Sequence, residues 1–429
     1  MTKKTSIASR LPLVTVAIVG LWLVLQVALI VAYWDYPQDP NPDIHGYMQH
    51  ALSNYRNHTT FPSRLNLYQQ YIQSPGMVNY LLLQHALFGT TDFNIDKIFN
   101  LLLHIGILVN VYYLARRFFG QGVAYVATCI YCLLPSNIFI PIWHLSEIPY
   151  LFLALTGFSL SLHRRPVAIV AAAVLFAVAH TFRPLVLAFL LTSVVFYAIE
   201  WRRIAAYLLL LLPYAGILYA VGMHNKANTG YFVTSSTTGG YNLIMTANDK
   251  AHAWPEFAIF GDSTNLAYVP NRQHLTFAEK DSIYKARAMR WIRQHPVRYA
   301  ALYVEKIGRL WAGDTWSIPP FSRWDNYDYI RVQPQEQQGR LVLIRRAIQA
   351  VEGLPYYVLF VVFCIALVRF RRVILTRKGL PLLIMALGTA GTCLFTVEIR
   401  FHYPYLFCMV LWASMEVHRW LLGYKVVRL

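Results

Sequence analysis

Residues 11–34 read LPLVTVAIVGLWLVLQVALIVAYW, an uncharged apolar run that follows Lys3, Lys4 and Arg10. At about 1.5 Å per residue, a helix of this length crosses the roughly 30 Å hydrocarbon core of a bilayer with some tilt. A cleaved signal peptide would have a shorter apolar region and a small-residue cleavage site. We therefore expect an uncleaved first membrane helix.

The composition of the whole chain agrees with this interpretation. Of the 429 residues, 57% are hydrophobic and 14% are charged, whereas soluble domains carry about a quarter charged residues. This balance excludes a soluble enzyme, a disordered chain and a disulfide scaffold. The net charge of +18 does not indicate a nucleic-acid partner, because the basic residues form short groups at alternate ends of the apolar runs rather than one face.

Further apolar runs follow the first and predict an all-α, polytopic membrane bundle of about ten transmembrane helices. A shorter apolar segment at 77–88 is expected to lie at the membrane interface. The other predicted spans are 95–113, 122–140, 148–162, 167–182, 185–199, 205–222, 354–368, 380–397 and 403–422.

The distribution of basic residues gives this bundle an orientation. Cytoplasmic connections carry an excess of Lys and Arg, and here every second connection is strongly basic, with Glu200 and Glu416 as its only acids. The connections on the other side hold nearly as many acids as bases. An even number of crossings therefore puts both termini in the cytoplasm. The basic residues of the inner connections are Lys3, Lys4, Arg10, Arg116, Arg117, Arg164, Arg165, Arg202, Arg203, Arg369, Arg371, Arg372, Arg377, Lys378, Arg419, Lys425 and Arg428.

We divide the chain into three parts. Residues 1–222 form an N-terminal transmembrane module with a first outer loop at 35–94, residues 223–352 form an extracytoplasmic segment, and residues 353–429 form a C-terminal three-helix part. Within the outer segment, residues 281–311 alternate apolar and basic side chains, and Pro296 interrupts them. This pattern predicts two amphipathic helices that lie on the membrane surface or cap the bundle.

Four charged residues stand alone at the outer ends of predicted spans. Glu147 is the only formal charge between Arg117 and Arg164, and Arg183 the only one between Arg165 and Glu200. Glu398 and Arg400 are the only ones between Lys378 and Glu416. Ionisable groups near membrane depth are costly and tend to be functional. Each taken singly could be a solvated helix end, but their convergence on one face favours a site.

The first outer loop adds three acids, Asp35, Asp39 and Asp43, in the stretch WDYPQDPNPDIHGY. Its prolines exclude a helix until Asp43, after which Asp43 and Tyr47 fall on one helical face. Asp43 stands where an N-cap residue is expected. The two interpretations are that Asp43 only caps a helix, or that it holds a carboxylate at the mouth of the bundle.

These residues make a chemically consistent set. A carboxylate can accept the proton of an acceptor hydroxyl, and arginines can hold a phosphate leaving group bidentately. Transfer from a lipid-phosphate donor requires both. His144 and Glu147 together are too few for a defined metal site, so the metal is unknown and both are weak candidate ligands.

The order of these parts resembles the GT-C superfamily of integral-membrane glycosyltransferases, in particular the bacterial branch similar to protein O-mannosyltransferases and lipid A aminoarabinose transferases. The resemblance covers most of the chain and is not specific to one sugar. The matching stretches are 43–47, 74–80 with 87–89, 100–103 with 115–120, Leu134-Pro135 with 146–149, Arg183-Pro184, 239–243 with Asn248, 288–311, and Arg400 before the last span.

The resemblance implies a polyprenyl-phosphate-sugar donor, used at the outer face of a bacterial inner membrane by an inverting mechanism in which dependence on a metal varies. No cofactor is certain, and a divalent cation is the one candidate. The acceptor would be a lipid, a glycan or a protein. By the same resemblance Asp43 is the proposed base, Glu147 matches an acid of the second outer loop, and Arg183 and Arg400 stand where basic residues meet the donor phosphate. We place Tyr47, Tyr241, Asn242 and Glu398 with these arginines as substrate-binding residues.

Two other functions remain open at this stage. A polymerase or ligase of lipid-linked glycans is also a multi-span protein with outer-loop arginines, but it relies on arginine and histidine rather than on a first-loop acid such as Asp43. A transporter or lipid flippase would show midplane charges, broken helices in symmetric halves and often a repeat. Here the charges lie at one face and the sequence shows no repeat, so the transferase is favoured.

Overall fold

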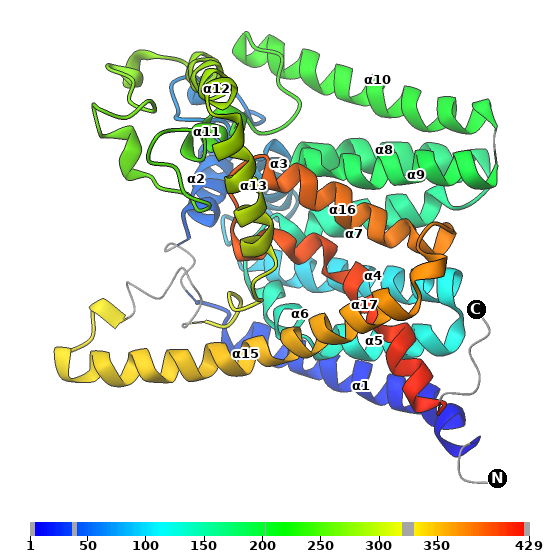
Figure 1. The fold of residues 1–429 in the computed structure, drawn as a ribbon. Helices are drawn as coiled ribbons and strands as arrows, with labels where there is room; N and C mark the ends of the chain where they lie inside the picture. Colours follow the sequence, from blue (N-terminus) through cyan, green and yellow to red (C-terminus); the bar gives the residue numbers. More distant parts are fainter. Residues whose placement is uncertain (1–4, 37–40, 202, 320–329, 424–429) are drawn as a thin grey trace.

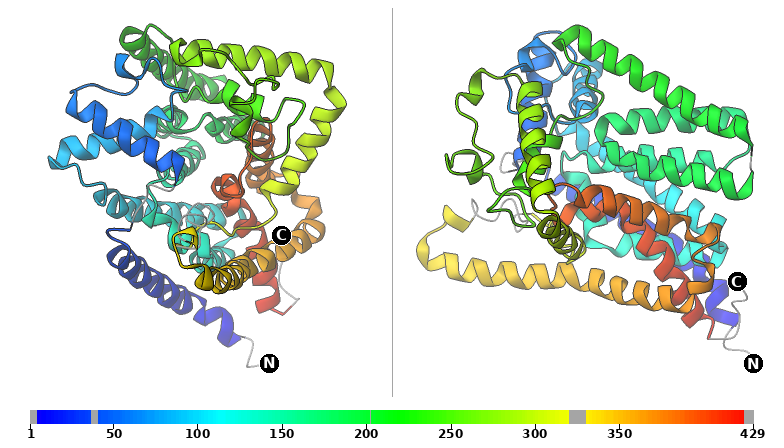
Figure 2. Two further views of the ribbon diagram at one scale, coloured as in Figure 1. Left: turned by 90° about the vertical axis from the view of Figure 1, so that its left-hand side faces the viewer. Right: turned by 45° about the horizontal axis from the view of Figure 1, so that its top comes forward.

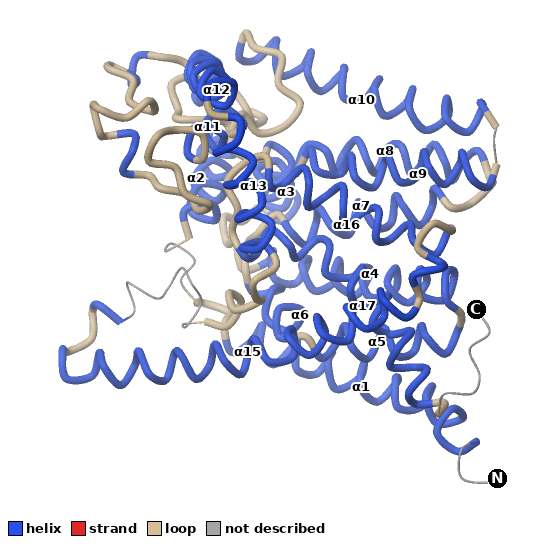
Figure 3. The backbone as a smooth tube through the Cα atoms, viewed as in Figure 1, coloured by secondary structure: helices blue, strands red, loops and turns tan. Residues whose placement is uncertain are grey.

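The computed structural model describes residues 5–36, 41–201, 203–319 and 330–423, and every regular element within them is a helix (Figure 3). The expected all-α fold is confirmed. The helices form one bundle with a smaller helical cap at one end (Figure 1).

Each predicted span overlaps a helix of the bundle, and these helices run side by side in both further views (Figure 2). Their bounds are α1 (Thr5–Ala32), α4 (Ile95–Phe119), α5 (Gln121–Leu133), α7 (Glu147–Ser161), α8 (Pro166–Phe182), α9 (Leu187–Glu200), α10 (Ile204–Thr229), α15 (Gln335–Arg369), α16 (Leu380–Cys393) and α17 (Tyr403–Leu421).

The lengths of these helices bear on the number of membrane crossings. Within the described residues, α1, α4, α10 and α15 are long and apolar enough to cross a bilayer, and α5 joined to the following helix would be a fifth. Shorter apolar helices lie at 147–161, 166–182 and 184–200. The chain is an integral membrane protein, and the count of about ten crossings stays a prediction.

Two predicted spans are wrong in their extent. The span 122–140 is not continuous, because α5 ends at Leu133 and the chain bends by 70° into the segment from Pro135 to Ile142. Proline lacks the backbone N–H that would continue the helix. The amide of Gln26 on α1 donates to the carbonyl oxygens of Asn137 (3.3 Å) and Ile138 (2.9 Å) after the break. The span 380–397 is also too long, since α16 ends at Cys393.

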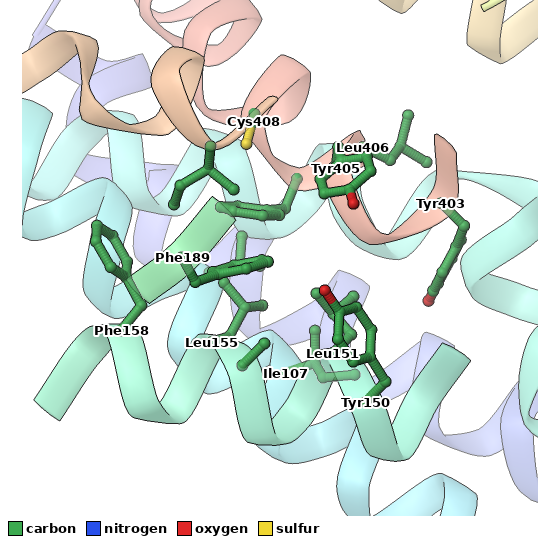
Figure 4. Close-up of a cluster of buried hydrophobic side chains, with 14 of the residues drawn as sticks. Ile107, Tyr150, Leu151, Leu155, Phe158, Phe189, Tyr403, Tyr405, Leu406 and Cys408 are labelled. Atoms are coloured by element: carbon green, nitrogen blue, oxygen red, sulfur yellow. The ribbon is translucent and has the colours of Figure 1, made fainter. Parts of the chain in front are cut away.

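The core lies where α4, α7, α9 and α17 meet. Ile107, Leu151, Leu155, Phe158 and Phe189 pack there at 1% exposure or less (Figure 4). The helix α17 is the central element, because every side chain from Tyr403 to Glu416 is buried. Lipid tails are as apolar as these side chains, so close packing rather than transfer from water holds such helices together. A residue just before α17 is therefore held by the most rigid part of the bundle.

The outer cap contains α11 (Gly239–Met245), α12 (Phe277–Gln294) and α13 (Pro296–Leu310). The prediction of two helices separated at Pro296 is confirmed. Thr276 and Glu279 form a capping box that fixes the start of α12. The helix α12 packs against α11, while α13 contacts α16, so these helices cover one end of the bundle (Figure 1). The helix α15 begins inside the predicted outer segment, at Gln335.

Candidate active site

Asp43 lies in the first turn of α2 (Pro42–Arg56), the helix that follows the proline-rich loop. The N-cap residue is Asn41, whose side-chain oxygen accepts hydrogen bonds from the backbone N–H groups of Asp43 (2.9 Å) and Ile44 (3.2 Å). The expectation that Asp43 is the N-cap is therefore wrong, because Pro42 pre-sets the first helical position and moves the cap one residue upstream of it. The Asp43 carboxylate is left free to face the bundle, and Tyr47 is buried one turn later.

Glu147 and Arg183 come from neighbouring helices. Glu147 is the first residue of α7 and is fully buried. Arg183 directly follows α8, which ends there because Pro184 keeps the preceding residue in an extended conformation. The Arg183 guanidinium donates to Glu147 Oε1 at 2.7 Å and to Ser146 Oγ at 3.1 Å. The two predicted charges thus neutralise each other across two helix ends.

Arg400 is the residue that connects the acids of the cluster. It lies in the short helix η8 (Ile399–His402), directly before α17, and is 4% exposed. Its guanidinium donates to the Asp43 carboxylate and, through Nε, to Glu398 Oε2 at 2.9 Å. A third acid, Glu147, lies 3.7 Å from Nη1. Burial opposes the charged form, but the carboxylates of Asp43, Glu398 and Glu147 outweigh it, so the pKa of Arg400 lies well above its ordinary value.

These groups open into a cavity of about 340 Å³ between the bundle and the outer cap. The size is within the range of small-molecule sites in proteins. Glu147 does not line this cavity, because it lies behind the two arginines. The predicted residues that do line it are Asp43, Tyr47, Arg183, Tyr241, Asn242, Glu398 and Arg400.

Aromatic rings form much of the remaining wall. Phe401 lies beneath both guanidinium groups, with its ring centroid 5.6 Å from Arg183 Cζ and 5.2 Å from Arg400 Cζ. The face of an aromatic ring attracts a guanidinium group and orients the plane of that group. Tyr241 stacks on Phe260 at 4.4 Å and so presents a fixed aromatic surface to the cavity. Flat rings of this kind suit the apolar face of a sugar.

Sequence reasoning missed a polar strip on the opposite wall. Tyr71, Gln73 and Ser74 line the cavity from the segment between the first loop and α3 (Pro75–Phe88). Ser74 caps α3 by accepting from Met77 N, and its hydroxyl also donates to the carbonyl of Phe182 at 2.9 Å. The Ser-Pro pair is a recognisable helix start, but nothing in the sequence indicates that α3 begins beside Arg183.

The comparisons with known proteins give the fold a name. No protein-family model and no curated protein matches the sequence. The structure aligns with the oligosaccharyltransferase of Archaeoglobus fulgidus at a TM-score of 0.50 and 11% identity, covering 94% of this chain and 50% of that one. It also aligns with ArnT from Cupriavidus metallidurans at a TM-score of 0.38 and 16% identity, covering 93% and 78%.

The chain has the GT-C fold. It spans about half the length of the archaeal oligosaccharyltransferase, and the shared part contains the bundle and the cap that enclose the cavity. The expected fold is thereby confirmed.

His144 does not join the candidate site. Its Nδ1 lies 3.0 Å from Asp96 Oδ2, in a separate buried network in which Asp96 also accepts from Gln84 (2.9 Å) and Asn100 (3.1 Å). Among the described residues, no group of three or more His, Cys, Asp or Glu side chains is placed to hold a metal ion. At the cavity itself the carboxylates are engaged by arginines.

A glycine sets the position of Arg183 in this fold. Gly76 of α3 packs so closely on the end of α8 that a Cβ atom there would lie 2.5 Å from Phe182 Cδ2 and 2.7 Å from Phe182 N. We expect Gly76→Ala to lower the free energy of unfolding by about 1–3 kcal/mol, because α3 and α8 must separate. Thermal unfolding in detergent measures this. Gly216→Ala on α10 is the matched control, since its Cβ would meet no atom within 4 Å. Equal melting temperatures for both variants would contradict the close contact.

Proposed function

We propose that this protein is a membrane glycosyltransferase that moves a sugar from a polyprenyl-phosphate-sugar donor to an acceptor hydroxyl at the outer face of a bacterial inner membrane, with inversion. One observation carries the proposal: Asp43, Glu147, Arg183 and Arg400, four charges from distant parts of the sequence, form one ion-paired cluster, and three of them, Asp43, Arg183 and Arg400, line the cavity. The archaeal protein with the same fold is an oligosaccharyltransferase.

The two arginines supply the binding site for the donor phosphate. Guanidinium groups hold phosphate oxygens bidentately and keep their charge when buried. Arg183 and Arg400 stack on the same ring of Phe401, so their planes are held before a ligand arrives. Preorganised donors of this kind stabilise the negative charge that grows on a leaving phosphate.

Asp43 supplies the base. The acceptor oxygen attacks the anomeric carbon of the donor sugar and forms the new glycosidic bond. The bond between that carbon and the phosphate oxygen breaks, and its electron pair leaves with the polyprenyl phosphate. The proton of the acceptor hydroxyl passes to the Asp43 carboxylate. Attack from the face opposite the phosphate inverts the configuration.

The ion pairs imply an order of events. The Asp43 carboxylate is paired with Arg400, and a carboxylate held by a guanidinium is a weak base. A donor phosphate competes with Asp43 for the same N–H groups. Binding of the donor therefore frees the carboxylate at the moment when the acceptor is needed. Glu147 stays buried beneath Arg183 and positions it.

We propose further that a divalent cation is not required. Arg400 already bridges the carboxylates of Asp43 and Glu398 and lies beside Glu147, and a cation would have to displace it from all three. The role of a Lewis acid at the phosphate falls to the two guanidinium groups.

Purified protein incubated with a panel of polyprenyl-phospho-sugars tests the proposal. We expect one sugar to give free polyprenyl phosphate and a glycosylated acceptor, at a rate that excess EDTA leaves within about twofold. Absence of polyprenyl phosphate release from every donor, with donor bound, would contradict a transferase. Loss of activity in EDTA that Mg²⁺ or Mn²⁺ restores would contradict only the cation proposal.

The orientation is a proposal with its own test. We expect a membrane-impermeant thiol reagent applied to intact cells to modify cysteines introduced at Asn57 and Gly261, and not cysteines introduced at Arg164 and Arg371. The basic connections set this orientation, and both labelled positions lie on the side of the candidate site. Labelling at Arg164 in intact cells would contradict it, with permeabilised cells as the control for reactivity.

A further inference from the structure

A second cavity lies directly behind the wall of the candidate site. It has a volume of about 670 Å³ and is lined by α3, α4, α7, α8 and α10, together with the end of the first outer loop. Its walls are mainly apolar, with Tyr80, Phe152, Val178, Ile217 and Val221 among the side chains. We call it the α8–α10 groove.

The groove faces the lipid. The helix α10 is at the edge of the bundle (Figure 2), and only 17% of its most apolar stretch is buried. On the groove wall Leu83 is 53% exposed and Val178 is 38% exposed. A groove between membrane helices with exposed apolar walls is filled by hydrocarbon rather than by water.

The groove and the candidate site share a wall. Phe182 lines both cavities. Gly76 and Pro75 line the groove, and the preceding residue, Ser74, lines the site. The helix α3, which lines the groove, also packs against α2, the helix that carries Asp43 and Tyr47.

The polarity of the groove limits what it can bind. None of the described residues that line it carries a formal charge at neutral pH, and its polar side chains, which include Thr60, Asn79 and His224, gather at the outer end. Thr60 Oγ1 lies 3.0 Å from His224 Nε2, and Asn228 lies 3.1 Å from the same nitrogen. An acyl or prenyl chain with an uncharged, hydroxyl-bearing headgroup matches this arrangement, and a phosphate does not.

We infer that the acceptor is itself a lipid and that its hydrocarbon tail lies in the α8–α10 groove. The inference rests on the proposed transferase function and names its acceptor class. The Phe182 side chain separates the two cavities, and the headgroup presents its hydroxyl to Asp43 when that side chain turns aside. The donor uses the other side, since its phosphate belongs at the arginines and the cavity wall beside them is apolar at Leu185 and Phe395. The two lipids then approach the anomeric carbon from opposite sides, as inversion requires.

Filling the groove tests this assignment. Ala220 lines it from α10, whereas Ala215 is exposed on the same helix and does not line it. Ala220→Trp removes room for several methylene groups of a lipid tail, so we expect binding of the tail to weaken about tenfold or more. Ala215→Trp is the matched control and should change it by less than about twofold. Both variants should keep the affinity for polyprenyl phosphate.

The readout is photolabelling in phosphatidylcholine nanodiscs with a diacylglycerol that carries a diazirine in one acyl chain. We expect cross-links at groove residues such as Phe152 and Val221, a loss of about tenfold in Ala220→Trp, and no competition by polyprenyl phosphate. If the lipid-facing sides of α1 and α10 are labelled as strongly as the groove in all variants, the probe reports contact with bulk lipid only. Competition by polyprenyl phosphate would assign the groove to the donor. Either result overturns the inference.

The labelling does not depend on turnover, so it separates two failures. If the donor panel releases no polyprenyl phosphate while the groove is still labelled, the transferase proposal fails and the groove remains a lipid site. If polyprenyl phosphate is released but Ala220→Trp neither loses label nor slows transfer to a lipid acceptor, the acceptor is not held by its tail in this groove.

Discussion

Replacing Asp43 by Asn should lower the rate of sugar transfer by about 10²–10⁴-fold, the usual contribution of a positioned general base. Asn keeps the shape of the side chain and removes its ability to take a proton. The fold should survive, because Asn41 and not Asp43 caps α2. Donor binding should be unchanged or slightly tighter, since Arg400 loses one competing carboxylate. Release of polyprenyl phosphate measures the rate, and thermal unfolding checks the fold.

Asp35→Asn is the matched control for this experiment. Asp35 belongs to the same loop, but its carboxylate faces Asn94 at 3.4 Å and lies outside the cavity wall. We expect less than about a twofold change in rate. Equal losses at Asp35 and Asp43 would indicate that the loop binds a cation collectively. Full activity in folded Asp43→Asn protein would remove Asp43 from the mechanism and leave Glu147 as the candidate base.

The second large effect is expected at Arg400. Two charge-assisted hydrogen bonds to a phosphate contribute roughly 1.5–3 kcal/mol each. Arg400→Ala should therefore weaken the binding of polyprenyl phosphate by about 100-fold or more, as titration by tryptophan fluorescence measures. It should also destabilise the fold, because Asp43, Glu147 and Glu398 lose the cation between them.

Two further variants separate the loss of the ligand site from the loss of the fold. Arg400→Lys keeps the charge but not the planar fork, so it should restore the melting temperature more fully than donor affinity. Arg272→Ala removes a guanidinium outside the cavity and should leave both quantities unchanged. If Arg400→Lys binds polyprenyl phosphate as tightly as the unaltered protein, Arg400 holds the acids together without touching the donor.

The sequence predicted the positions of the helices well, since charge-free runs between basic connections are strong signals. Two of its errors came from proline. Pro135 bends the third predicted span, and Pro42 shifts the cap of α2 to Asn41. Hydropathy is averaged over many residues, so it detects neither the bend nor the shifted cap. A single proline changes the course of the backbone without changing the mean hydropathy of the run.

The candidate site was predictable only in part. Arg183, Glu398 and Arg400 stood out because each interrupts a long charge-free stretch, and a charge at a helix end needs a partner. The pairing itself was not predictable, since Asp43 and Arg400 lie 357 positions apart and only the tertiary fold brings the start of α2 to the short helix η8 that carries Arg400. Gln73 carried no signal, and Ser74 indicated only the start of a helix and not a place in the cavity wall, because uncharged polar residues are common in loops.

The charge balance of the cluster bears on how the site empties after each turnover. Asp43, Glu147 and Glu398 surround Arg183 and Arg400, so the cluster as a whole carries an excess of negative charge. A phosphodiester donor bears one negative charge, but the phosphomonoester that it leaves behind bears nearly two near neutral pH. The carboxylates therefore repel the phosphomonoester product more strongly than they repel the phosphodiester donor. Under the proposed mechanism, Asp43 must first lose the proton that it took from the acceptor. The three carboxylates then repel the polyprenyl phosphate and favour its release before the next donor binds.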